Sequence, residues 1–376
     1  ITETNEARAK GSGMTTMDHS FVGSTALGNK YGTVAMDFQN WNKTLTAKKS
    51  WFILGDRIVF LGSDIKNSTD NEAYSDVDNR KIQRESRNRS ASKNDYSVVA
   101  DGKEVPVSDE DSKMQVKDLL LKSQNTQMNI GYKFLEPTTV NVKKENRKGT
   151  WKDINEGQSD EEVENSFISI VQPHDATNNK YAYVLYPNRS AKEFEEEKNN
   201  DDIQVVENSE KTQAVFDKTN QIYGVVKYDD SELTLEDGLV LKEKGIYTIK
   251  KEGNKLDIAF LNPEDPSAGL SALNTGKYEL QNSTEPTVEN KIRYYTYLVK
   301  KQTEEETTQE QTQEQTQQSS SESTTEIRNR EDLKDSNTTK EETLPATGAK
   351  NFEVYTLLGI LLLTISLIFS KKRLQK

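Results

Sequence analysis

Residues 49–61 read KSWFILGDRIVFL. Two apolar runs of strand length, rich in aromatic and β-branched residues, flank the dipeptide Gly55-Asp56. This pattern predicts a β-hairpin, with glycine at the position that tolerates a positive φ angle. The segment therefore favours antiparallel β structure for the surrounding chain.

The same kind of signal recurs along the first 300 residues. Helical candidates are few: residues 191–198 are short and charged, and residues 114–122 are ambiguous between helix and strand. Many short strands separated by turn signals favour sandwiches over a parallel sheet, so we predict an all-β fold. The further predicted strands are residues 129–134, 166–171, 181–186 and 222–228, together with a hairpin of residues 245–250 and 255–261.

Length and composition predict two β domains and a linker. Three hundred residues exceed what one core usually holds. The polar residues 198–212 suggest a boundary between a domain of residues 1–200 and one of residues 205–300. Residues 301–343 consist largely of Thr, Gln, Glu and Ser, which cannot bury enough apolar surface to fold, so we predict a disordered spacer.

The C-terminus resembles the cell-wall sorting signal of Gram-positive surface proteins. Leu344, Pro345, Ala346, Thr347 and Gly348 precede an apolar run over residues 354–369 and a cationic end over 371–373. The resemblance implies that a sortase joins the Thr347 carboxyl to peptidoglycan, after the apolar run has entered the membrane as an anchor helix. An ordinary membrane anchor with a chance pentapeptide is the alternative. We expect a secreted, wall-anchored protein.

Composition excludes several classes of site. The chain has no Cys and two His, so disulfides, thiolate metal sites and His-based metal sites are not expected, and no cofactor is predicted. The formal net charge is −12, which argues against nucleic acid as a partner. The chain begins with Ile1 and no signal peptide, so we expect a fragment, a processed form or a truncated gene product.

Four segments resemble bacterial hyaluronate lyases, and they occur in the order of that family. The similarity extends over nearly all of residues 1–285 and indicates a polysaccharide lyase of hyaluronate or chondroitin type. The segments are AMDFQNWNKTLTAKKSWF (35–52), GTWKDINEGQSD (149–160) followed by VEN (163–165), YAYVLYPN (181–188) and GVVKYDD (224–230).

The resemblance implies a modular enzyme that cleaves hyaluronan, or possibly the related chondroitin, by β-elimination. In that family an α/α toroid carries the catalytic Asn, His and Tyr, and a layered β super-sandwich and a small β-sandwich domain follow. This chain corresponds to the β part, so the toroid is expected to be a missing partner. His19 and His174 stand outside any matching context, and surface or turn positions are predicted for both. No catalytic residue is assigned.

Two groups of residues are candidates for glycan contact. Arg80, Lys81 and Arg84 belong to a local cationic cluster that also includes Arg87 and Arg89. Arginine pairs with carboxylates in a bidentate manner, but a solvated loop between strands is the favoured interpretation. The three tryptophans could stack on sugar rings, although core packing is favoured for them. They are Trp41, Trp51 and Trp151.

Three functional hypotheses follow. The leading one is the C-terminal β portion of a wall-anchored hyaluronate lyase, with this chain alone inactive. The second is a non-catalytic surface protein that uses the β part for glycan binding or adhesion. The third is a truncated remnant that retains only its anchor.

Overall fold

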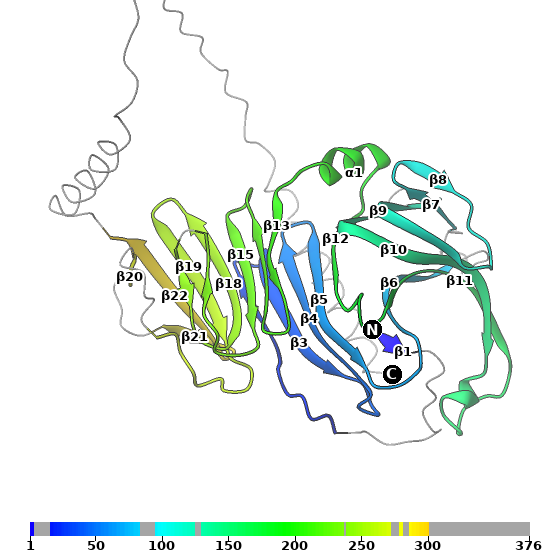
Figure 1. Ribbon diagram of the computed structural model, residues 1–376, viewed down its shortest axis with the longest axis horizontal. Helices are drawn as coiled ribbons and strands as arrows, with labels where there is room; N and C mark the ends of the chain where they lie inside the picture. Colours follow the sequence, from blue (N-terminus) through cyan, green and yellow to red (C-terminus); the bar gives the residue numbers. More distant parts are fainter. Residues whose placement is uncertain are drawn as a thin grey trace, which may run out of the picture. The chain divides into compact units, whose positions relative to one another are not determined.

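The computed structural model describes residues 1–3, 16–82, 95–124, 129–236, 238–271, 278–280 and 286–300. Residues Ile1–Thr303 form one compact unit, in which antiparallel strands dominate (Figure 1), so the all-β prediction is confirmed. The predicted linker 301–343, the pentapeptide 344–348 and the anchor segment 354–369 lie outside the described residues. No helix within the described ranges has the length and apolar character needed to cross a bilayer.

The first sheet has 12 strands, in the order β1-β6-β11-β10-β12-β5-β4-β3-β2, with β9 and β7 continuing from β10 and β8 pairing with β7. Its neighbours are antiparallel throughout, which is why short turns suffice to join consecutive strands. Its strands are β1 (Thr2–Glu3), β2 (Val22–Leu27), β3 (Tyr31–Gln39), β4 (Leu45–Leu54), β5 (Ile58–Asn67), β6 (Ala73–Ile82), β7 (Tyr96–Ala100), β8 (Lys103–Val105), β9 (Ser112–Ser123), β10 (Ile130–Gly149), β11 (Val163–His174) and β12 (Tyr181–Pro187).

The second sheet has eight strands, in the order β13-β14-β15-β18-β19-β22-β20, and β21 pairs with β22. A separate pair, β16 with β17, completes the strands. The bounds are β13 (Ile203–Asn208), β14 (Thr212–Asp217), β15 (Ile222–Lys227), β16 (Leu233–Thr234), β17 (Val240–Leu241), β18 (Gly245–Glu252), β19 (Lys255–Leu261), β20 (Tyr278–Leu280), β21 (Thr287–Glu289) and β22 (Ile292–Val299).

Both predicted hairpins form. β4 and β5 pair across a turn in which Gly55 has φ +78°, and β18 and β19 pair across a turn in which Gly253 has φ +58°. Glycine adopts these left-handed conformations without the steric cost of a Cβ atom. The ambiguous segment 114–122 is a strand, β9, because it pairs with both β10 and β7.

The predicted helix also forms, as α1 (Ala191–Lys198). Ser190 and Glu193 make a capping box: the Glu193 amide donates to Ser190 Oγ at 3.2 Å, and the Ser190 amide donates to Glu193 Oε2 at 2.8 Å. Reciprocal capping satisfies amides that a short helix leaves unpaired. Phe194, 1% exposed, fixes the helix to the first sheet with its ring against Tyr186.

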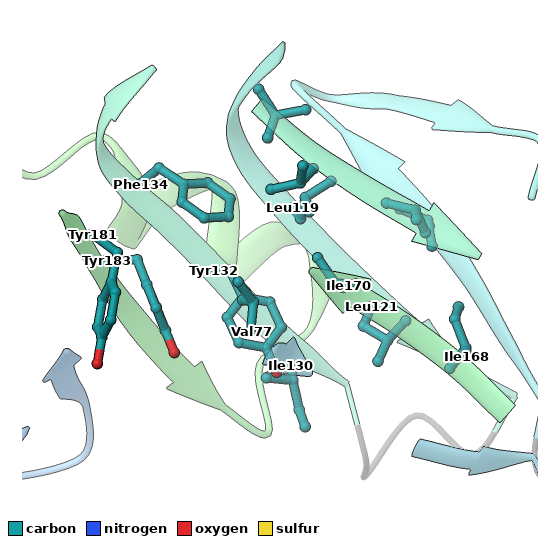
Figure 2. Packing of buried hydrophobic residues seen from close by; sticks show 14 of the residues in the cluster. Val77, Leu119, Leu121, Ile130, Tyr132, Phe134, Ile168, Ile170, Tyr181 and Tyr183 are labelled. Atoms are coloured by element: carbon teal, nitrogen blue, oxygen red, sulfur yellow. The ribbon is translucent and has the colours of Figure 1, made fainter. Parts of the chain in front are cut away.

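An aromatic cluster fills one part of the core within the first sheet. Figure 2 shows Tyr132 and Phe134 of β10 beside Tyr183 of β12. The Tyr183 ring centroid lies 6.2 Å from that of Tyr132 and 6.0 Å from that of Phe134. Tyr181 and Tyr183 are buried and Ala182 between them is half-buried, which is the alternation that the sequence predicts for this strand.

A second core joins the two sheets. It combines Phe52, Val59 and Leu61 of the first sheet with Val215 and Val226 of the second, and all five are fully buried. Polar contacts run beside it. Gln213 Nε2 donates to Ser63 Oγ at 3.0 Å and to the Lys48 carbonyl at 3.2 Å. The sheets are therefore held together by both apolar packing and specific hydrogen bonds.

Candidate functional site

The predicted glycan-contact residues Arg80 and Lys81 lie on strand β6, so the loop expected for them is wrong. Successive side chains of a strand point to opposite faces of the sheet. The side chains of Arg80 and Lys81 therefore cannot bind a glycan together on one surface. In a loop, the two side chains could have pointed the same way. The other members of the cluster lie outside the described residues: Arg84, Arg87 and Arg89.

Arg80 forms an ion pair with a carboxylate that is largely buried. Its Nε donates to Asp78 Oδ2 at 2.6 Å, and the Tyr132 hydroxyl donates to the same carboxylate. The Asp78 side chain is only 8% exposed. Burial alone would lower the pKa of Arg80, but the hydrogen bond to Asp78 and its charge outweigh burial and raise that pKa. Arg80 thus neutralises a buried carboxylate.

Replacing Arg80 by alanine is expected to lower the free energy of unfolding by about 1–3 kcal/mol, because Asp78 would lose its cation. Lys81→Ala, the adjacent cation on the exposed side, is the matched control and should change it by less than about 0.5 kcal/mol. Urea unfolding of both variants measures the difference. Equal values would contradict the separate roles assigned to the two residues.

Lys81 lies on the more exposed side of the same strands. The register places Lys81 of β6 opposite Phe167 of β11, and Phe167 opposite Glu145 of β10. Arg147 lies over the Phe167 ring, 4.7 Å from its centroid, and its Nε donates to Glu145 Oε1 at 2.7 Å. We call Lys81, Glu145, Arg147 and Phe167 the Lys81 face. It combines two cations with one aromatic ring and one carboxylate.

The two histidines differ in setting. His19 lies in the segment before β2, and its Nδ1 is 2.8 Å from Asp37 Oδ1. His174 is the last residue of β11, where the expected turn begins, but it is 8% exposed and is therefore not a surface residue. Its Nδ1 donates to the Asn178 carbonyl at 3.0 Å, so Nε2 accepts from the Ser75 hydroxyl at 2.7 Å. Both ring nitrogens of His174 are occupied within the fold.

Stability should fall on acidification because of His174. Burial lowers its pKa from 6.5 to about 4. Below about pH 6.5 the unfolded chain therefore binds a proton at His174, whereas the folded protein does not bind it until the pH approaches 4. The contribution of neutral His174 to the free energy of unfolding is complete above pH 6.5 and is lost as the pH falls toward 4. Between about pH 7.5 and pH 5 the loss should be about 2 kcal/mol.

His174→Gln should remove this contribution, since glutamine can still hydrogen-bond but does not titrate. We expect the difference in unfolding free energy between variant and parent to shrink by about 2 kcal/mol as pH falls over the same interval. Urea unfolding at the two pH values measures it. A difference that stays constant would exclude His174 as the titrating group.

The tryptophans are not in the core. Trp41 and Trp51 are half-buried, and Trp151 is 59% exposed, so core packing is wrong for Trp151. Trp151 opens a short 3₁₀ helix (Trp151–Asp153) between β10 and β11. Thr150 and Asp153 cap this helix reciprocally, with the Thr150 amide donating to Asp153 Oδ2 at 2.9 Å. An ordered turn thus presents an aromatic ring to solvent.

A groove of about 870 Å³ lies where β10, the β11–β12 turn and β13 meet. Its lining residues fall within the ranges 133–139, 172–182 and 201–208. These segments are far apart in the chain, so no local sequence pattern predicts the groove. Within the described ranges, no group of three or more His, Asp or Glu side chains is placed to hold a metal ion.

Comparison with protein families gives three matches along the chain. Residues 1–198 match the super-sandwich domain of polysaccharide lyase family 8, and residues 204–270 match its C-terminal β-sandwich domain. Residues 336–373 match the LPXTG cell wall anchor motif, which indicates a secreted protein anchored to the cell wall.

Curated relatives include a hyaluronate lyase of Staphylococcus aureus, 35% identical over 277 residues, which cover 71% of this chain and 32% of that protein. The hyaluronate lyase HylB of Enterococcus faecalis is 37% identical over 223 residues, covering 57% of this chain and 20% of that protein. The chain thus spans about a third or less of the length of these relatives.

Among solved structures, Paenibacillus xanthan lyase aligns with a TM-score of 0.66 at 24% identity and covers 79% of this chain and 30% of that one. A chondroitinase AC lyase aligns with a TM-score of 0.55 at 21% identity, over 65% of this chain and 34% of that one. At such identities the two likenesses establish the fold.

Proposed function

The chain belongs to polysaccharide lyase family 8, and we propose that it forms the β part of a hyaluronate lyase that degrades hyaluronan outside the cell. The observation that carries the proposal is the 35% identity to the S. aureus hyaluronate lyase over 277 residues. Chondroitin is the second substrate to test, because it offers the same uronic acid chemistry. A sortase would attach the protein to peptidoglycan through Thr347.

The proposed reaction is a β-elimination at a uronic acid. A base removes the C5 proton after the neighbouring carboxylate has been neutralised, the bond from C4 to the glycosidic oxygen breaks, and an acid protonates that oxygen. The product carries a C4–C5 double bond. We infer that the groups for these steps lie in an α/α domain outside this chain.

The histidine geometry supports that inference. A general base needs a free ring nitrogen within reach of the substrate proton. His174 is buried, with Nδ1 and Nε2 both hydrogen-bonded, and His19 is held by Asp37. His174 therefore lacks the setting of an eliminase base, whereas His19 pairs through Nδ1 alone and its part in catalysis is decided by the substitution test below. The β part would instead brace the catalytic domain and line one wall of its cleft.

The test is ultraviolet absorbance of the unsaturated uronate, with hyaluronan as substrate. The purified chain alone should give no product, and the complete gene product, or the chain with the α/α domain added in trans, should give product. Chain-dependent product from this chain alone would refute the division of labour, and His19 and His174 would then be replaced first. Inactivity of the complete gene product on hyaluronan and chondroitin would refute the lyase proposal.

We propose that the Lys81 face contacts the acidic glycan, in place of the cluster first considered. Lys81 is exposed, and Arg147 stacks on Phe167 in a position to meet a carboxylate. In the complete enzyme, Lys81→Ala should raise KM for hyaluronan about threefold without changing kcat or stability, as expected for one exposed charge. Unchanged KM would remove this face from the binding surface.

A glycan-binding or adhesive protein without lyase activity is the second candidate. The exposed Trp151 on its capped turn favours it, since an ordered aromatic ring in solvent is suited to stacking on a sugar. Binding of hyaluronan by this chain that is lost in Trp151→Ala, combined with inactivity of the complete gene product, would select this candidate.

A further inference from the structure

We propose that the groove between β10, the β11–β12 turn and β13 binds an uncharged, N-acetylated oligosaccharide. This site is separate from the proposed elimination. Its test measures binding and not cleavage, so it stands or falls independently of the lyase proposal.

Two strands that line the groove are irregular at the groove. On β10 the pairing with β9 shifts between Lys133 and Thr138, and on β13 the pairing with β14 shifts between Val205 and Glu207. A bulge leaves residues unpaired, bends the strand and redirects side chains, and bulges are frequent beside binding sites. The volume of the groove, about 870 Å³, falls within the range that binds small ligands.

Gln172 provides an unused hydrogen-bond acceptor in the wall. It is 3% exposed, and its Nε2 donates to the Lys180 carbonyl at 3.1 Å. A carbonyl can only accept, so this contact fixes the orientation of the amide. Gln172 Oε1 is then left without a donor among the described residues. A buried acceptor in that state costs about 1–3 kcal/mol and calls for a donor, such as a ligand hydroxyl or amide N–H.

The charge of the groove disfavours a polyanion. Two lysines, Lys133 and Lys180, face three carboxylates, those of Glu136, Asp201 and Glu207. Lys133 Nζ is already engaged, donating to the Asn200 carbonyl at 2.8 Å. A uronate would meet net negative charge here, so the ligand that fits is uncharged.

The remaining surface combines apolar and polar groups in the way a sugar requires. Leu135, Ala182 and Val205 are half-buried and form an apolar strip that suits a pyranose face and an acetamido methyl group. Asn179 and Thr139 line the same groove with groups that donate and accept. An N-acetylated sugar matches both surfaces and supplies the N–H that Gln172 Oε1 lacks.

The experiment titrates the complete chain with the β-1,4-linked tetramer of N-acetylglucosamine, by calorimetry and ligand-observed NMR. Cellotetraose, without acetamido groups, and a hyaluronan tetrasaccharide, with carboxylates, are the comparison probes. The N-acetylglucosamine tetramer should bind at least about tenfold more tightly than either. Equal affinity for the hyaluronan probe would overturn the assignment of an uncharged ligand.

Variants locate the binding. Gln172→Met keeps the volume and removes the acceptor, and Asn179→Ala removes one polar group; each should weaken binding about fivefold. Ala182→Trp should abolish it by filling the groove. Asn165→Ala, a half-buried amide on β11 outside the groove, is the control and should leave affinity unchanged. Absence of binding at millimolar ligand, or affinity unchanged in all three groove variants, would overturn the proposal.

Discussion

Arg57→Ala is expected to lower the free energy of unfolding by about 3–5 kcal/mol, a large share of the stability of an ordinary domain. Arg57 precedes β5, and its guanidinium donates to both oxygens of Asp202, at 3.1 and 2.6 Å, and to Asp217 Oδ2 at 3.1 Å. The Asp217 side chain is fully buried. Alanine would leave that carboxylate in the interior without its cation.

The electrostatics of this site agree with that expectation. Burial would lower the pKa of Arg57, but the hydrogen bonds and charges of Asp202 and Asp217 outweigh burial and raise it. Because Arg57 lies in the turn that joins β4 and β5 of the first sheet and Asp217 ends β14 of the second, the ion pairs link the two sheets. Arg57→Ala should therefore lower the free energy of unfolding by weakening the packing of one sheet against the other.

Two controls separate charge from geometry. Arg57→Lys keeps the positive charge but cannot form the bidentate contact, so it should cost an intermediate amount. Lys66→Ala removes an exposed cation, whose Nζ lies 2.6 Å from Asp64 Oδ1, and should cost less than about 1 kcal/mol. Urea unfolding measures all three. A loss below about 1 kcal/mol for Arg57→Ala would show that water or protonation compensates Asp217.

Local sequence patterns correctly predicted the elements whose conformation depends on residues close by in the chain. The hairpin of β4 and β5 follows from two apolar runs around Gly55, and α1 forms where its charged, short sequence predicts a helix. The family resemblance is confirmed by the matches to the super-sandwich and C-terminal β-sandwich families of polysaccharide lyase family 8. In each case the deciding contacts lie within a few residues, or the whole segment is shared with known proteins.

Local signals failed where partners are distant in sequence. β9 was ambiguous because its strand character comes from pairing with β10 and β7. Arg80 and Lys81 formed one cluster in the sequence, but the strand sends them to opposite faces. Trp151 was assigned to the core because tryptophan is usually buried. The sequence does not reveal that this residue lies in the exposed connection between β10 and β11. The groove is lined by two strands with irregular pairing, and no local sequence pattern predicts these irregularities.

Gly224 lies where the two sheets approach each other closely. It lies on β15, and a Cβ atom there would stand 2.2 Å from Phe52 Cδ1 and 3.0 Å from Thr33 Oγ1 of the first sheet. Phe52 is fully buried, so in a close-packed interior its ring can move only by displacing neighbouring side chains. Thr33 Oγ1 is itself 3.0 Å from Thr248 Oγ1. A side chain at residue 224 must therefore force the sheets apart or displace the ring.

Gly224→Ala should accordingly cost about 3 kcal/mol through overpacking, and Phe52→Ala about 3–5 kcal/mol through the cavity it leaves. The double variant decides whether both act at one contact. Removing the ring frees the space that the new methyl group needs, so Gly224→Ala should cost less than about 1 kcal/mol in the Phe52→Ala background. Denaturant unfolding of the four proteins gives a coupling energy of about 2 kcal/mol or more. Additive losses would mean that the sheets relax independently of the Phe52 ring, and that the close approach at Gly224 does not set their separation.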